Sequence, residues 1–439
     1  MASNPLIDVF RIKDLRERIL FTAFMLIVFR LGATIPIPGI NVNALKLYFM
    51  SQESTGIGIT DYFNFFSGGA FKNFSVFMLG IMPYITTSII MQLLLLVFPS
   101  LKRMTEEEGG KKKFQRYTRY ATVVVCVIQS YAVTVYANSI PDAIAMNRLA
   151  YTLIAMLTVT TGTIFLMWMG EQITQRGIGN GISLLIFAGI VARMPNGVWT
   201  LLQSIRSGEL NPVFVIIVSA MFVLVIGLVI YEQQGQRKIP VNYAKRVVGR
   251  KMYGAQNTYI PFKINPSGVI PVIFASSIMT FPLQIAGGLG SQFRWLADFS
   301  QWLRPGGIPY LVIYSLLIVF FAYFYTQVSL NPVEIARQIR EHGGSIPGIR
   351  SEKIEEYLSR ILNRIILPGS LFLAFIAIIP TLIQNLFNFP AQVAYLMGGT
   401  SLLIMVGVDL DTMSQIEGHL RMHHHDGLVK KGKLRSRNL

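Results

Sequence analysis

The sequence predicts an all-α, polytopic membrane protein with ten transmembrane helices. Of its 439 residues, 52% are hydrophobic and only 14% are charged, which is more apolar material than one soluble core needs. A helix that crosses a hydrocarbon core of roughly 30 Å requires about 20 apolar residues. The apolar runs of that length are 19–37, 74–98, 117–137, 149–170, 181–203, 211–231, 266–286, 309–329, 366–386 and 391–411.

The positions of Lys and Arg predict how these spans are oriented. Most of the basic residues fall in six segments, namely the N-terminus, 99–119, 171–180, 232–265, 330–365 and the C-terminal tail. With ten spans, all six segments lie on one face, and basic residues are retained on the cytoplasmic side. We therefore expect both termini to be cytoplasmic. The same rule accounts for most of the net charge of +17, with a basic docking face as an addition.

The start of the chain lacks the pattern of a cleaved signal peptide. Charged residues continue to Arg18, and the first apolar run has the length of a span without a small-residue cleavage site. We expect the first helix itself to act as the membrane signal. The single cysteine, Cys126, lies within an apolar run and cannot form an internal disulfide.

No catalytic motif is visible in the sequence. It has no His-Glu-x-x-His zinc pattern, no Gly-x-Ser-x-Gly elbow and no Gly-x4-Gly-Lys-Ser/Thr phosphate loop. The histidines 423–425 are adjacent in a basic tail, an arrangement that rarely builds a metal site. We predict that the chain is not an enzyme and that it binds no metal or cofactor. Any work driven by ATP must then be done by a partner.

Charged residues deep within the apolar runs are scarce. Arg30 and Arg193 are the clearest cases, and both lie close enough to the outer interface for their side chains to reach it. A secondary solute transporter, the main alternative, favours functional polar groups at the bilayer midplane and short cytoplasmic loops. The sequence has few such groups and long basic loops. A membrane-embedded enzyme is a weaker alternative, because no nucleophile, base or metal set converges.

Two stretches carry an unusual pattern. FSVFMLGIMPYITTSIIMQLL, residues 74–94, contains Gly80 and Pro83, which loosen a helix. WMGEQITQRGIGNGISLLIFAGI, residues 168–190, contains the glycine-rich turn GIGNG between two spans. In each stretch two isoleucines are spaced one helical turn apart on one face.

These two stretches resemble the signatures of the SecY family, the channel subunits of the bacterial protein translocase. Further matches are IPIPGI at 35–40, YAKRVVGRKMYGAQ at 243–256, NPSGVIPVIFASSI at 265–278, IPGIR at 346–350 and GGTSLLIMV at 398–406. The resemblance extends from about Ile12 to Arg437. It implies a channel in the bacterial cytoplasmic membrane that passes unfolded secretory polypeptides and releases hydrophobic segments laterally into lipid.

The resemblance also implies a domain organisation. Spans 1–5 and 6–10 form two pseudo-symmetric halves, residues 1–205 and 206–412, arranged as a clamshell, and 413–439 is a cytoplasmic tail. The hinge lies near 195–212, and the clamshell opens between spans 2, 3, 7 and 8. We see no internal repeat in the sequence itself.

In this family a short re-entrant helix before the second span plugs the idle channel. Re-entrant backbone at membrane depth is tolerated only where protein buries it or it lines a cavity. An ordinary outer loop is the alternative interpretation. The matching residues are Asp61, Tyr62, Phe63, Asn64, Phe65, Phe66, Ser67, Gly68, Gly69, Ala70, Phe71, Lys72 and Asn73, with a bend at Gly68-Gly69.

The resemblance assigns a constriction as well. The family's pore ring corresponds to Ile81, Ile85, Ile186, Ile190, Ile273 and Ile404. A narrow apolar collar dewets when it is empty, which opposes ion leakage. Isoleucine on a span is more often a lipid-facing or packing residue, so the spacing alone would not select these six.

The second span also carries polar residues on the side of the lateral opening that the resemblance implies. Thr86, Thr87 and Gln92 lie near the seam, and we hypothesise that they tune how easily it opens. Ordinary interhelical hydrogen bonds are an equally good interpretation.

The cytoplasmic loops match the family's docking surfaces. Arg350 corresponds to the arginine used for the SecA motor ATPase, and Arg250 with Lys251 to the basic tip of the preceding loop; solvated topology charge is the alternative. Ser351-Glu352 stand where Pro-Gly often follows that arginine. The expected partners are SecE and SecG subunits, SecA, the ribosome, signal peptides with nascent chains, and membrane lipids.

Overall fold

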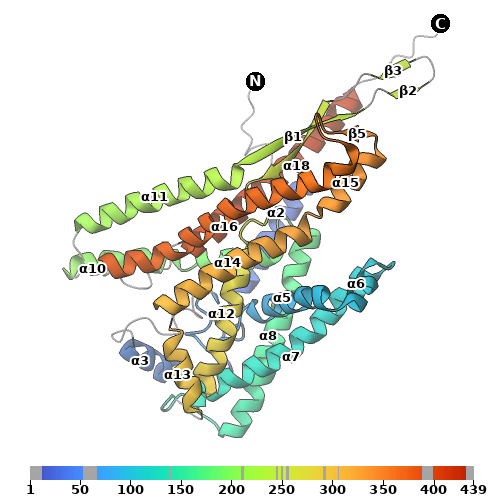
Figure 1. Cartoon of the computed structure of the whole chain (residues 1–439). Coiled ribbons are helices and arrows are strands. Elements are labelled where there is room, and N and C mark those ends of the chain that lie inside the picture. Colours follow the sequence, from blue (N-terminus) through green and yellow to red (C-terminus); the bar gives the residue numbers. More distant parts are fainter. Residues whose placement is uncertain are drawn as a thin grey trace. The chain divides into compact units, whose positions relative to one another are not determined.

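We describe the protein from a computed structural model (Figure 1). The structure describes residues 12–52, 67–138, 140–208, 212–243, 246–248, 251–253, 257–289, 293–304, 306–387 and 399–431. Contacts divide the chain into two compact units. The first comprises Met1–Val198, Leu283–Ser300 and Ile404–Leu439, and the second comprises Trp199–Pro282 and Gln301–Leu403. The halves 1–205 and 206–412 stay a prediction.

The described part of the first unit is mostly helical, with turns and isolated β-bridges between its helices. Its helices are α2 (Lys13–Gly32), α3 (Val42–Gln52), α5 (Met82–Val97), α6 (Pro99–Glu106), α7 (Gly110–Asn138), α8 (Arg148–Arg176) and α9 (Gly181–Val191). The helices α7 and α8 run side by side, as Figure 1 shows, and α5 packs on α7. Three further helices cross a unit boundary: α10 (Met194–Arg206), α13 (Arg294–Trp302) and α18 (Gly399–Lys431).

The second unit combines long helices with a small sheet. Its helices are α11 (Pro212–Gln234), α14 (Ile308–Ser329), α15 (Pro332–Glu341) and α16 (Ile354–Phe387), while α12 (Ile270–Leu289) crosses the boundary. The strands β1 (Gln236–Tyr243), β4 (Asn257–Lys263) and β5 (Gly344–Ser345) form an antiparallel sheet in the order β4-β1-β5. The strands β2 (Arg246–Val248) and β3 (Lys251–Tyr253) form a separate hairpin.

Six described segments are long and apolar enough to cross a membrane, namely Gly110–Asn138, Arg148–Arg176, Gly181–Arg206, Pro212–Gln234, Ile308–Glu341 and Ser351–Ile383. A seventh is counted if Met82–Leu95 and Pro99–Thr105, which meet at an angle of 105°, form one broken span. The run 391–411 begins among residues outside the described ranges. The all-α membrane fold is confirmed, whereas the number ten stays a prediction.

The apolar run 74–98 is not one continuous helix, which corrects the expected boundary. The helix α5 starts only at Met82, and residues 67–81 before it form consecutive turns. Gly80 takes a φ of 58°, which suits glycine, and Pro83 occupies the first helical turn, where its missing N–H costs least. The two helix-loosening residues therefore place the start of the helix.

Candidate functional site

The described part of the predicted plug, Ser67–Asn73, lies against α2 and α9. The Arg30 guanidinium donates a hydrogen bond of 2.8 Å to the carbonyl oxygen of Gly68. A Cβ atom on Gly68 would lie 2.7 Å from the Cα atom of Gly189 in α9, so the two backbones touch. These seven residues form turns, and 61–66 lie outside the described residues, so the plug helix stays a prediction.

Aromatic side chains anchor the same segment. Phe71 and Phe74 are buried and have ring centroids 6.1 Å apart, and the Phe74 ring stacks on Tyr136 of α7 at 6.5 Å. On the backbone, the Ile37 N–H donates to the Phe74 carbonyl oxygen at 2.8 Å. The segment is thus packed inside protein, which is the condition for irregular backbone at membrane depth.

The six isoleucines of the predicted ring are all buried in the structure, with exposed fractions between 0% and 6%. Ile81 immediately precedes α5, and Ile85 follows one turn later. Ile186 and Ile190 occupy α9, while Ile273 lies in α12 and Ile404 in α18. Five belong to the first unit, and Ile273 belongs to the second. Their burial disfavours the lipid-facing alternative, and their meeting in one ring stays a prediction.

The glycine-rich turn before α9 is held by three different helices. The Asn180 side chain caps α9 by accepting from the N–H groups of Ile182 and Ser183. The Ile178 N–H donates to Thr22 Oγ1 of α2 at 3.1 Å. The Gly179 N–H donates to Gln415 Oε1 of α18 at 2.9 Å. Sequence reasoning found the turn but not its two long-range acceptors, because neither has a pattern of its own.

The predicted lateral-gate residues bond within their own helix. Thr87 Oγ1 donates to the Pro83 carbonyl oxygen at 2.8 Å, and Gln92 Nε2 donates to Ser88 Oγ at 3.4 Å. Thr86 is 3% exposed. Among the described residues, the buried Gln92 Oε1 atom has no hydrogen-bond partner. The hydrogen bonds of Thr87 and Gln92 are thus within α5, whereas the alternative interpretation expected bonds between helices.

A compact subdomain in the second unit carries the predicted docking loop. Its core includes Ile239 and Val241 of β1, Ile346 of the loop, and Ile354 and Leu358 of α16. Sequence reasoning expected structure in these loops but missed the sheet. In QRKIPVNY the apolar residues Ile239, Val241 and Tyr243 stand at every second position, and this alternation is the signal that could have found it.

Arg350 is exposed at the tip of that loop. Its carbonyl oxygen accepts from the Lys353 N–H at 2.9 Å, which starts the short 3₁₀ turn η2 (Ser351–Lys353) that leads into α16. Ile346 anchors the loop in the core, so Arg350 is presented to solvent from a supported turn. No ion pair with Arg350 is seen among the described residues. Arg250 lies outside the described residues, and Lys251 begins β3.

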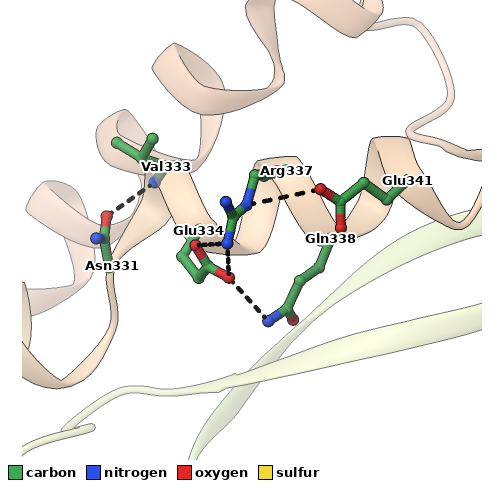
Figure 2. A network of polar contacts seen from close by, with 6 residues as sticks. All are labelled: Asn331, Val333, Glu334, Arg337, Gln338 and Glu341. Carbon is green, nitrogen blue, oxygen red and sulfur yellow. Dashed lines mark hydrogen bonds and ion pairs between the residues drawn. The ribbon is translucent and has the colours of Figure 1, made fainter. Parts of the chain in front are cut away.

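Most of the charges on α15 compensate one another along a single helix (Figure 2). The Arg337 guanidinium lies 2.7 Å from the Glu334 carboxylate and 3.7 Å from Glu341, and Gln338 also donates to Glu334. Asn331 caps the helix by accepting from the Val333 N–H. The helix α15 follows the apolar stretch of α14. The hydrogen bond from Arg337 holds the pKa of Glu334 below its usual range.

Within the described ranges, no group of three or more His, Cys, Asp or Glu side chains could hold a metal ion. The side chains of residues 423–425 lie outside what the structure describes.

Fold and site together define a multi-pass helical membrane protein with a buried turn segment, Ser67–Asn73, and a structured polar loop domain. Residues 75–413 match the family described as SecY. The protein translocase subunit SecY of Borreliella burgdorferi is 49% identical over 417 residues, covering 94% of this chain and 95% of that protein. That of Thermotoga maritima is 45% identical, covering 98% of each. The chain belongs to the SecY family.

Solved structures share the fold. A chain from "The structure of a protein conducting channel" aligns with a TM-score of 0.65 at 20% identity, covering 91% of each chain. A SecY structure whose title states that the plug domain stabilises the closed state aligns with a TM-score of 0.64 at 21% identity and the same coverage. Sec61 from a canine ribosome-channel complex gives 0.62 at 19% identity, again with 91% of each chain covered.

Proposed function

We propose that this chain is a protein-conducting channel for unfolded polypeptides. The observation that carries the proposal is its identity of 49% over 417 residues to a protein translocase subunit. Six buried isoleucines and a turn segment packed between α2 and α9 supply the parts that such a channel needs. The polypeptide displaces the plug and passes the apolar collar, which yields around it and excludes ions when empty.

Lateral release of hydrophobic segments is the second part of the proposal. Segments that are apolar enough partition into lipid when the seam opens, and transfer free energies decide which segments do so. The buried Gln92 Oε1 atom supports a role in gating, because an unsatisfied polar atom makes the packed state less favourable. Replacing Gln92 with Leu should raise the hydrophobicity that a segment needs for insertion. An unchanged threshold would count against this role.

The channel acts in the bacterial cytoplasmic membrane with both termini in the cytoplasm, and it has no catalytic activity of its own. Its partners are small subunits resembling SecE and SecG, and a ribosome or the SecA motor at the cytoplasmic loops. The exposed position of Arg350 on a supported turn favours docking there. Sec61, which has the same fold, was solved in a ribosome-channel complex.

Translocation of a radiolabelled secretory precursor into proteoliposomes tests the proposal. The vesicles hold this chain with SecE and SecG, SecA and ATP are added, and protease protection is scored. We expect protection that needs ATP and is lost on Arg350→Glu. Arg304→Glu, the same charge change at a position that topology places on the outer face, serves as the matched control.

Each outcome separates the two claims. Protection that survives Arg350→Glu would support the channel and contradict the docking role. No protection despite an intact complex would contradict the channel function and favour the transporter alternative.

A further inference from the structure

Arg30 is a cation at the end of the apolar part of α2, and its guanidinium bonds to a neighbouring segment. It lies in the last turn of α2, where a positive charge is favoured by the helix dipole. Its Nη1 atom lies 2.8 Å from the Gly68 carbonyl oxygen, 38 residues further along the chain. Sequence reasoning assigned this side chain to the outer interface. The structure adds a partner for this side chain, the carbonyl oxygen of Gly68 in the Ser67–Asn73 segment.

The acceptor residue is held from a second direction as well. Gly68 has a φ of 66°, a conformation that glycine adopts without strain. The Cα atom of Gly68 packs directly against the backbone of Gly189, which leaves no room for a side chain. Gly189 lies between Ile186 and Ile190 of the predicted ring. One residue of the segment is therefore fixed between α2 and α9.

The end of α2 and the residues that follow it pack on the turns after the Ser67–Asn73 segment. The rings of Phe29 and Phe77 stack with centroids 6.2 Å apart, and a Cβ atom on Gly32 would collide with the Phe77 ring. The Val76 N–H donates to the Ile35 carbonyl oxygen at 3.0 Å. These contacts lie downstream of Gly68. Of the recorded contacts from α2, the Arg30 bond is the one that reaches the Gly68-Gly69 bend.

A hydrogen bond from a charged donor is stronger than a neutral one, and it is stronger still where water is scarce. Among the described residues no carboxylate forms an ion pair with Arg30. When the segment moves away, Arg30 loses this acceptor, so the bond opposes movement.

We propose that Arg30 is a positioning residue that latches the Ser67–Asn73 segment in place and thereby sets how readily the channel opens. Only the effect on channel opening rests on the proposed function. Whether Arg30 restrains the segment can be measured without any translocation. The bond to the carbonyl must break each time the segment leaves.

Thiol labelling tests the latch directly. Ala70 is 0% exposed, so an Ala70→Cys probe in a Cys126→Ser background should react slowly while the segment stays in place. Arg30→Met removes the donor and should raise the labelling rate by about tenfold, as loss of a charge-assisted hydrogen bond predicts. Arg30→Lys keeps a charged donor and should restore slow labelling in part. Arg148→Met, at an exposed arginine of α8, should leave the rate unchanged.

The two proposals fail differently. Equal labelling rates in Arg30→Met and the parent protein would overturn the latch, even if translocation is normal. Faster labelling without any translocation by the parent protein would keep the latch and contradict the channel function. If Arg30→Met does not accumulate, Arg30→Gln, with a neutral donor, should label at an intermediate rate, and a rate equal to the parent's would overturn the proposal.

Discussion

At the scale of single residues, glycines decide how closely the turn segment approaches the helices around it. The sequence drew attention to Gly68, Gly69 and Gly80 because of where they fall in the chain. It gave no reason to single out Gly162, in the middle of α8. There a Cβ atom would lie 2.2 Å from the carbonyl oxygen of Val76, so only glycine at position 162 lets the backbone at Val76 approach α8 this closely.

Gly162→Ala should therefore destabilise the protein. The added methyl group would meet backbone, which cannot turn aside as a flexible side chain can, and overpacking of this kind costs about 1–3 kcal/mol. Thermal unfolding of the purified protein in detergent should show a lower midpoint. Gly227→Ala is the matched control, because no atom lies within 4 Å of its added Cβ. Equal midpoints for the two variants would contradict the prediction.

At the scale of elements, helices of the first unit are joined by specific polar contacts in addition to apolar packing. Arg119 of α7 donates two hydrogen bonds, of 2.9 Å and 2.7 Å, to the two carboxylate oxygens of Glu171 in α8. A bidentate contact of this kind fixes geometry as well as charge. It links the two helices near their cytoplasmic ends as the topology predicts them.

A double-mutant cycle of Arg119→Gln and Glu171→Gln should reveal coupling between α7 and α8. The side chains are 44% and 22% exposed, so solvent screening limits the coupling to about 1 kcal/mol. Urea unfolding of the four proteins in detergent measures it. Strictly additive effects would show that the pair contributes nothing beyond its separate parts.

The charge network of α15 predicts a dependence on pH. The hydrogen bond from Arg337 lowers the pKa of Glu334 from its usual value of 4.5. The Glu334 carboxylate therefore stabilises the helix at pH values above 4.5, and this contribution is lost as the pH falls through the folded-state pKa. At pH 7, amide exchange in α15 should be faster in Glu334→Gln than in the parent protein. The difference should shrink as the pH falls through the lowered folded-state pKa of Glu334 and disappear below it, where both side chains are neutral. A difference that persists at low pH would assign the effect to packing.

At the scale of the whole molecule, the six buried isoleucines are the clearest link between sequence and proposed function. Burial separates them from exposed residues of the same type, such as Ile217 of α11, which is 46% exposed. An apolar lining resists ions because it dewets. The effect of the predicted collar depends on its being apolar throughout.

Ile190→Ser should raise the ion leak of the empty channel. A hydroxyl group in the collar gives water a hydrogen-bonding partner and so favours wetting. Conductance across a planar bilayer containing the purified complex, with no precursor present, measures the leak. Ile217→Ser is the control, with the same change at an exposed position. An unchanged conductance for Ile190→Ser would argue that this side chain only packs.

The sequence by itself determined the helical membrane fold, because apolar runs of span length leave a chain few alternatives in lipid. Motif resemblance predicted by position a pore ring of isoleucines, a docking role for Arg350 and a plug that includes Ser67–Asn73. Only the tertiary structure decided where α5 begins, that QRKIPVNY pairs as a strand, and that Gly162 is a contact point. It also decided that Arg30 binds the carbonyl of Gly68. Periodicity and charge are local properties of a chain, whereas a contact between residues 38 positions apart exists only once the chain has folded.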